Sequence, residues 1–102
     1  MRIIKTSRIG EYGKKYARAS SSLKNWSTAT RSAVWKSFED VKNTFRSADQ
    51  ITVPNGYQVV VFNIGGGKFR LITAIHYNRG IVYIRKFMTH AEYNKEDWKN
   101  DP

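Results

Sequence analysis

The alternation of side chains between residues 57 and 88 constrains the fold of this 102-residue chain more than any other feature. Three runs in this region, residues 58–64, 68–77 and 81–88, are rich in β-branched and aromatic residues. Short segments that contain glycine, residues 65–67 and 78–80, separate the runs. Runs of this kind joined by such turns are typical of β-hairpins. The sequence therefore predicts a three-stranded antiparallel meander.

The same alternation predicts the pairing of the strands, because successive side chains of a strand point to opposite faces of a sheet. A slip of one residue would exchange every side chain between the faces, so the apolar pattern selects the register. The selected register pairs Phe62 with Leu71, Asn63 with Arg70, and Ile75 with Val82 or Ile84. The expected core face then holds Phe69, Leu71, Thr73, Ile75, Tyr77, Val82, Ile84 and Met88.

The opposite face of the predicted meander carries cations and aromatic rings: Asn63, Lys68, Arg70, His76, Tyr83, Arg85 and Phe87. Cations and rings on one surface suit single-stranded RNA, whose phosphates are anionic and whose bases stack on rings. A solvated sheet surface explains the same pattern, and the pattern alone does not decide between these interpretations. Lys86 departs from the pattern because it falls on the core face, and we expect it at the sheet margin with its stem buried. We interpret His76 as a surface residue.

The residues before the meander predict helices that cover its core face. Residues 2–5 are typical of a short strand, and Thr6 or Ser7 can begin a helix that runs to about Ala19. We expect the serines at 20–22 to interrupt the pattern before a second helix, and a further short helix to contain Val41 and Phe45. The predicted class is α+β, with one domain over residues 1–102. The second helix has one apolar side: Leu23, Trp26, Thr30, Ala33 and Val34.

The charge of the chain predicts a polyanionic partner. Lys and Arg number 18 against 8 Asp and Glu, a formal net charge of +10, and such an excess favours nucleic acid or an acidic protein surface. The chain has no cysteine and only two histidines, so we expect neither a metal nor another cofactor. No apolar stretch is long enough for a membrane span or a signal peptide, so we expect a cytoplasmic protein without membrane contact.

The residues after the last predicted strand, THAEYNK at 89–95, indicate a short C-terminal helix. Thr89 and Glu92 have the spacing of a capping box. His90 then lies in the first turn, where the helix dipole and the surrounding cations disfavour imidazolium. A neutral His90 can accept a proton, although a purely structural role explains its position equally well.

Several of these segments together resemble the HigB toxin family of bacterial type II toxin–antitoxin modules. The resemblance rests on residues 61–66 (VFNIGG), 68–72 (KFRLI), 81–85 (IVYIR) and 89–95 (THAEYNK), with support from residues 33–36 and 38–42. It covers most of the chain, and its most specific element is the THAEY block after the IR strand. The first helix contributes little to it.

The resemblance implies a compact RelE-like fold, with two helices packed on an antiparallel sheet. It also implies an mRNA interferase that cuts mRNA on the ribosome. Its partner would be a HigA-type antitoxin, which in this family is usually a helix-turn-helix DNA-binding protein.

RNA cleavage without a metal uses the ribose 2′-hydroxyl as nucleophile, so the protein must supply a base, an acid and cations around the phosphate. Guanidinium groups match phosphate oxygens, so we assign the phosphate to Arg70 and Arg85. His90 would act as base or acid, Lys68 would stabilise charge or act as an acid, and Tyr93 would stack on a base or donate a proton. The residues expected to bind RNA are Asn63, Tyr83, Phe87 and Lys95.

Two other functions fit parts of the sequence. A small protein that binds RNA or the ribosome and blocks translation without cleavage would need the same cationic face that carries rings. A DNA-binding regulator has less support, because the sequence has no helix-turn-helix pattern and its short helices suit core packing.

Overall fold

A computed structural model describes residues 1–100 of the chain, and a five-stranded sheet in the order β1-β5-β4-β3-β2 organises them. The strands are β1 (Arg2–Ile4), β2 (Asp49–Thr52), β3 (Gln58–Ile64), β4 (Phe69–His76) and β5 (Ile81–Thr89). The α-helices are α1 (Ser7–Lys15), α2 (Ser20–Ser32), α3 (Phe38–Thr44) and α4 (His90–Asn94). Short 3-10 helices occupy Ala17–Ala19, Tyr77–Arg79 and Asp97–Asn100. The predicted α+β class is confirmed.

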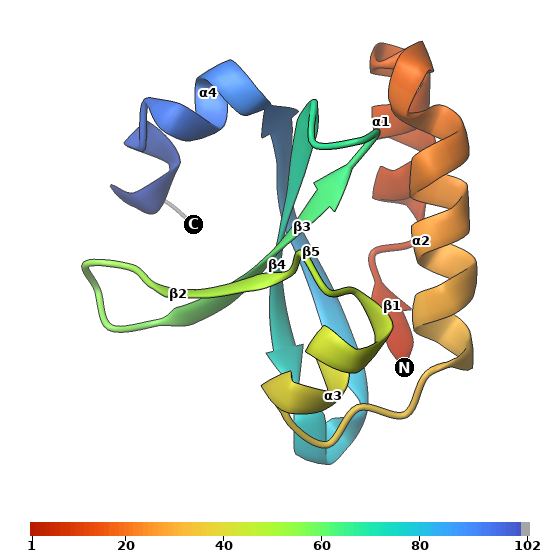
Figure 1. Ribbon diagram of the computed structural model, residues 1–102, viewed down its shortest axis with the longest axis vertical. Coiled ribbons are helices and arrows are strands. Elements are labelled where there is room, and N and C mark those ends of the chain that lie inside the picture. The colour runs from red at the N-terminus through yellow and green to blue at the C-terminus, as the bar shows by residue number, and fades with distance from the viewer. Residues whose placement is uncertain (101–102) are drawn as a thin grey trace.

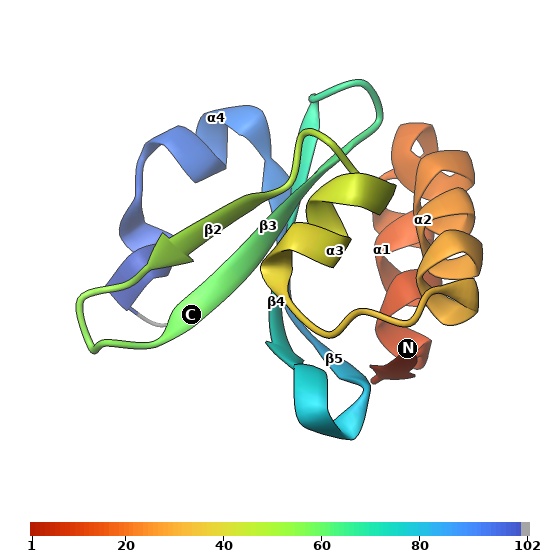
Figure 2. The ribbon, with the colours of Figure 1, turned by 60° about the horizontal axis from the view of Figure 1, so that its bottom comes forward.

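The helices lie in two groups on opposite faces of the sheet. Figure 1 shows α1 and α2 side by side on one face, with α3 near the lower end of that layer. Helix α4 and the segment that follows it lie on the other face, and the turned view in Figure 2 keeps this division. We call the first the helix face and the second the C-terminal face.

The predicted meander is confirmed, together with most of its register. Strands β3, β4 and β5 pair antiparallel in sequence order. The predicted pairs are present: Phe62 with Leu71, Asn63 with Arg70, and Ile75 with Val82.

A β-bulge in β5 overturns part of the predicted face assignment. Ile72 pairs with Lys86 but Thr73 pairs with Ile84, so Arg85 is an extra residue in β5. An extra residue shifts the alternation by one and exchanges the faces of all later side chains. The predictions that Phe87 lies beside Arg70 and that Met88 joins Val82 were therefore wrong. Phe87 is buried on the helix face, whereas Met88 and Lys86 belong to the C-terminal face.

The main core lies between the sheet and the helix face. Phe62 is 1% exposed and its ring contacts the rings of Trp26, Trp35 and Phe45, with centroid distances of 5.3, 6.1 and 5.3 Å. A second aromatic group lies at the other end of this layer, where Phe87 stacks on Phe69 at 5.4 Å. Phe62 therefore joins helices α2 and α3 to the centre of the sheet.

A second, smaller core lies on the C-terminal face. Trp98, 5% exposed, covers side chains from the middle of the sheet. The face expected to be open is therefore partly buried, because its alternating positions include apolar residues as well as cations. The buried members of this core are Val53, Val59, Val61, Ile72, Met88 and Trp98.

Strands β1 and β2 form the two edges of the sheet, and only β1 was predicted from the sequence. Strand β1 is the predicted N-terminal strand, and it pairs parallel with β5, with Ile3 beside Val82. Strand β2 was not predicted, because its residues, DQIT, are mostly polar and exposed at the sheet edge. It pairs antiparallel with β3 and extends the meander by one strand.

The predicted helix boundaries differ from the observed ones at the start and end of α2. Ser20, Ser21 and Ser22 form the first turn of α2 instead of interrupting the helical pattern. Helix α2 ends at Ser32, and Val34 is 78% exposed, so the prediction that Val34 lies on its apolar side was wrong. None of the helices within residues 1–100 has the length and apolar character to span a membrane.

Replacing Phe62 with alanine should strongly destabilise the protein. The change removes the ring that three other aromatic residues contact, and truncations of this kind cost about 3–5 kcal/mol. Denaturant unfolding followed by circular dichroism measures the free energy. Tyr57→Ala, at a side chain that is 67% exposed, is the control and should change it by less than about 0.5 kcal/mol. Equal effects of the two changes would contradict this account of the core.

Candidate active site

Arg70 and His90 meet at the corner where β5 gives way to α4. Arg70 Nη2 lies 2.9 Å from His90 Nδ1. Arg70 comes from β4 and points to the C-terminal face, while His90 is the first residue of α4. The backbone N–H of His90 donates to the carbonyl of Lys68 at 2.9 Å, so the start of the helix is fixed to the β3–β4 turn. His90 is exposed, and the pair is accessible to a ligand.

The Arg70 side chain is held by its own turn. Its Nη1 donates to the carbonyl of Gly67 at 2.6 Å and to that of Phe69 at 3.1 Å. The guanidinium carbon lies 5.4 Å from the centre of the Tyr93 ring, within the range of a cation–π contact. Gly67 has a φ of +89°, a conformation that side chains other than glycine rarely adopt. The glycine turn thus holds the arginine side chain in place.

The contact with Arg70 determines the hydrogen-bonding state of His90. A guanidinium group only donates hydrogen bonds, so Nδ1 of His90 accepts and carries no proton. With Nδ1 as the acceptor, the tautomer that fits this contact carries its proton on Nε2. The side-chain amide of Asn94 lies next to this atom, with Nδ2 and Nε2 3.1 Å apart. Since the N–H of Nε2 donates, the amide oxygen of Asn94 is its partner in the alternative amide orientation.

The predicted capping box at the start of α4 is confirmed. Thr89 Oγ1 accepts from the backbone N–H of Glu92 at 3.2 Å, and the Glu92 carboxylate accepts from the backbone N–H of Thr89 at 3.1 Å. These hydrogen bonds from Thr89 hold the pKa of Glu92 below its ordinary value. The box orients the first turn of α4 and therefore His90.

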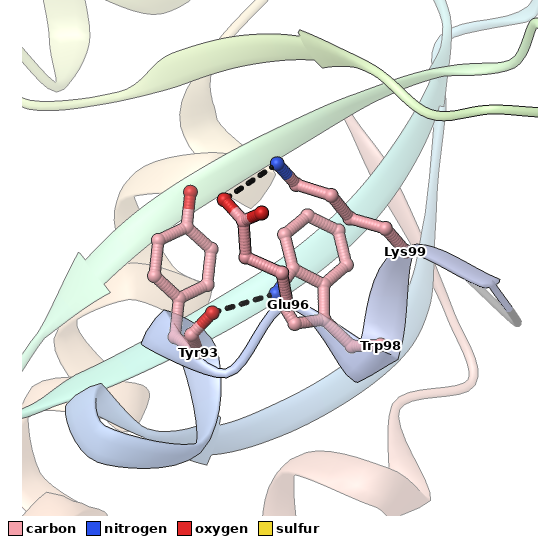
Figure 3. Close-up of polar contacts among 4 residues, drawn as sticks. All are labelled: Tyr93, Glu96, Trp98 and Lys99. Atoms are coloured by element: carbon pink, nitrogen blue, oxygen red, sulfur yellow. Dashed lines mark hydrogen bonds and ion pairs between the residues drawn. The ribbon is translucent and has the colours of Figure 1, made fainter.

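Tyr93 and Trp98 fix the end of α4 to the sheet (Figure 3). Their rings stack at 5.2 Å with an angle of 16°, and Trp98 Nε1 donates to the carbonyl of Tyr93 at 3.0 Å. An ion pair of 2.9 Å between Lys99 and Glu96 lies on the same loop. Burial raises the pKa of the Tyr93 phenol above its ordinary value. The phenol is therefore protonated near neutral pH and able to donate.

The other predicted site residues differ in their position relative to the Arg70–His90 pair. Lys68 is exposed in the β3–β4 turn, Asn63 is exposed opposite Arg70, and Lys95 is exposed at the end of α4. Phe87 is buried on the opposite face of the sheet, so the structure contradicts its predicted place on an RNA-binding surface. Asn94 was missed, although its position four residues after His90 places it on the same side of a helix.

Arg85 lies at the bulge and lines two hollows in the described part of the chain. One, of about 400 Å³, also includes Tyr83, and the other, of about 480 Å³, includes Lys95 and Trp98. Neither of these two hollows includes Arg70, His90 or Tyr93. We predicted from the sequence that Arg70 and Arg85 bind the same phosphate. In the structure they lie in different parts of the C-terminal face.

Comparison with known proteins links this chain to one family. The model of the HigB toxin family, described as the RelE-like toxic component of a toxin–antitoxin system, matches residues 19–96. The chain is similar to the mRNA interferase toxin HigB of Escherichia coli K12. It is equally similar to the mRNA interferase HigB of Escherichia coli O157:H7 and that of Shigella flexneri. Each is 27% identical over 94 residues, which are 92% of this chain and 88% of the relative.

The capping box should make the stability of α4 depend on pH. The pKa of Glu92 is lowered in the folded protein, so its contribution is complete above the ordinary pKa of a glutamate. The contribution is lost as the pH falls through the lowered folded value. Amide exchange of α4 at a series of acidic pH values measures this loss. Glu92→Gln keeps an acceptor but cannot titrate in this range, so an unchanged pH dependence in this variant would contradict the assignment.

Replacing Trp98 with alanine should release α4 without unfolding the sheet. The change removes the ring stack on Tyr93 and the hydrogen bond to its carbonyl. We expect amide exchange in α4 and the following turn to rise at least tenfold, a change of about 1.4 kcal/mol in local opening. Protection in β3 and β4 should remain. Trp98→Phe keeps a ring and should show a smaller rise, whereas a uniform rise over the whole chain would contradict local release.

Proposed function

Because this chain belongs to the HigB toxin family, we propose that it is a ribosome-dependent mRNA endonuclease that inhibits translation. The family match and the named activity of the similar HigB proteins support this activity. One toxin domain would span residues 1–102. Cleavage would proceed by attack of a ribose 2′-hydroxyl on the adjacent phosphate.

Membership of the family implies an antitoxin partner. We assign this role to a HigA-type helix-turn-helix protein, whose gene would be a neighbour of this one. The other partners in this proposal are mRNA and the ribosome, which place the protein in the cytoplasm. The net charge of +10 supports a partner rich in phosphate or carboxylate.

The observation that carries the proposal is the contact between Arg70 and His90. The lone pair of Nδ1, which a general base needs, is occupied by the guanidinium. A phosphate that binds Arg70 would draw the guanidinium away, since a charged acceptor forms the stronger hydrogen bonds. Nδ1 would then be free next to the bound phosphate. Substrate binding would thus release the base at the place where it is used.

The released His90 would take the proton of the 2′-hydroxyl while the 2′-oxygen attacks phosphorus. A cyclic 2′,3′-phosphate forms and the bond between phosphorus and the 5′-oxygen breaks. Arg70 would stabilise the charge of the transition state. The proton for the 5′-oxygen would come from Tyr93, whose phenol is protonated, or from Lys68, whose backbone carbonyl accepts from the backbone N–H of His90. The base, the acid and the charge-stabilising group of this proposal are therefore all side chains of the protein.

The other exposed residues of this face would bind the RNA on either side of the cleaved bond. Asn63 would donate to a phosphate or a base edge, and Lys95 would contact a phosphate. Arg85 and Tyr83 would bind a part of the strand beyond the Arg70 cluster, because they line a separate hollow. These roles need a strand several nucleotides long on the C-terminal face.

The variants Arg70→Ala and His90→Ala should each lower the cleavage rate by about 10²–10⁴-fold, the usual contribution of an acid–base or charge-stabilising group. Both side chains lie outside the buried cores, so folding should be retained. Primer extension on ribosome-bound mRNA measures the new 5′ ends, and growth arrest measures toxicity. Arg31→Ala, at an exposed cation in the last turn of α2, is the matched control and should keep full activity.

Unchanged toxicity of both variants would remove this cluster as the active site. Growth arrest with stalled but intact message would show a different outcome, a protein that blocks translation without cutting RNA. Circular dichroism of each variant separates loss of chemistry from loss of fold.

A further inference from the structure

The hollow between β3, β4 and β5 lies at the far end of the C-terminal face from α4. It has a volume of about 400 Å³. Its lining includes Tyr57, Gln58, Val59, His76, Tyr83 and Arg85. The reaction proposed above uses neither Tyr57 nor His76, so it assigns no role to these two lining residues.

The lining combines aromatic rings, an apolar floor and a cation. Tyr57 is 67% exposed although tyrosine rings usually bury much of their surface. His76 and Tyr83 contact each other edge to face, with ring centres 5.0 Å apart. Val59 is buried beneath, and Arg85 lines the hollow at the bulge. Rings with a nearby guanidinium are typical of surfaces on which unpaired bases stack.

A neighbouring hollow shares Arg85 with this one and reaches α4. This second hollow, of about 480 Å³, contains the cations Lys86 and Lys95 together with the carboxylates Glu92 and Asp97. Along β4, His76 is six residues beyond Arg70, a distance of about 20 Å at the usual rise of a strand. A single strand of RNA with several nucleotides can cover this distance. Its phosphates would follow the cations between the two ends.

We propose that this hollow binds an unpaired base of the RNA substrate, several nucleotides away from the cleaved bond. The inference rests on the proposed function and adds a second binding position to it. Tyr57 stacks on the base, Tyr83 and His76 form the side of the position, and Arg85 contacts the adjoining phosphate. The strongly positive charge of the chain favours RNA over an apolar peptide as the occupant.

The test is a titration of the ¹⁵N-labelled full chain with a 2′-O-methyl RNA hexanucleotide, which has no free 2′-hydroxyl and cannot be cut. We expect the amide signals of residues 57–59, 74–76 and 83–85 to shift with one Kd, together with those near Arg70. Tyr57→Ala should raise this Kd about tenfold, within the range measured for loss of one stacked base. Tyr57→Phe keeps the ring and should leave the Kd within about twofold of the original value.

Arg85→Ala should also weaken binding and should reduce the slope of log Kd against log salt by about 0.7, the value for one phosphate contact on a single strand. Arg46→Ala, which removes an exposed cation after α3, should leave the slope unchanged. An unchanged Kd for Tyr57→Ala, or shifts confined to the Arg70 cluster, would overturn the proposal. Shifts of the hollow with an antitoxin but none with RNA would overturn it as well.

The two proposals fail in different ways. If Arg70→Ala abolishes cleavage while the hollow does not respond to RNA, only the second binding position is wrong. If no message is cut while the hollow binds the hexanucleotide, the endonuclease assignment is wrong and the RNA-binding position stands.

Discussion

The bulge at Arg85 determines which of the following residues of β5 lie on each face of the sheet. Without the bulge, Phe87 would point to the C-terminal face and Met88 to the helix face. With it, Phe87 completes the aromatic group with Phe69 and Tyr12, and Met88 lies in the small core with Trp98. The two cores therefore depend on one irregularity of the β4–β5 ladder. The same irregularity lies at Arg85, which lines two hollows.

The small core explains how a short helix can hold His90 in a fixed position. Helix α4 has only five residues, too few to be stable on its own. It is fixed at its start by the capping box and the hydrogen bond to Lys68, and at its end by Tyr93 and Trp98. These contacts come from α4 and its cap, from the β3–β4 turn and from the segment after α4. The position of His90 relative to Arg70 is thus set by three parts of the chain.

Much of the fold follows from local patterns in the sequence. The meander and its register could be predicted because Phe62, Leu71 and Ile75 leave one arrangement that keeps apolar residues together. The capping box could be predicted from Thr89 and Glu92 because its chemistry is local. These predictions needed no knowledge of distant contacts.

The errors have a common physical cause. A bulge interrupts alternation without a signal in residue type, so Phe87 and Met88 were placed on the wrong faces. Strand β2 owes its structure to pairing with β3 and not to its own polar residues. The role of Trp98 depends on the chain folding back over Ile72 and Val61, which no local pattern indicates. In the candidate site, the structure brings Arg70, His90 and Tyr93 together, whereas Arg85 lines hollows that do not include them.

The left-handed conformation of Gly67 limits how this region can vary between related proteins. A methyl group at this position would lie 3.9 Å from Arg70 Nη1, and the backbone angle of +89° would be strained for any larger residue. Its carbonyl also holds the guanidinium in place. Substitution of Gly67 is therefore restricted, even though this residue has no side chain that could take part in the proposed reaction. A mutational scan would record it as an intolerant position for reasons of backbone shape alone.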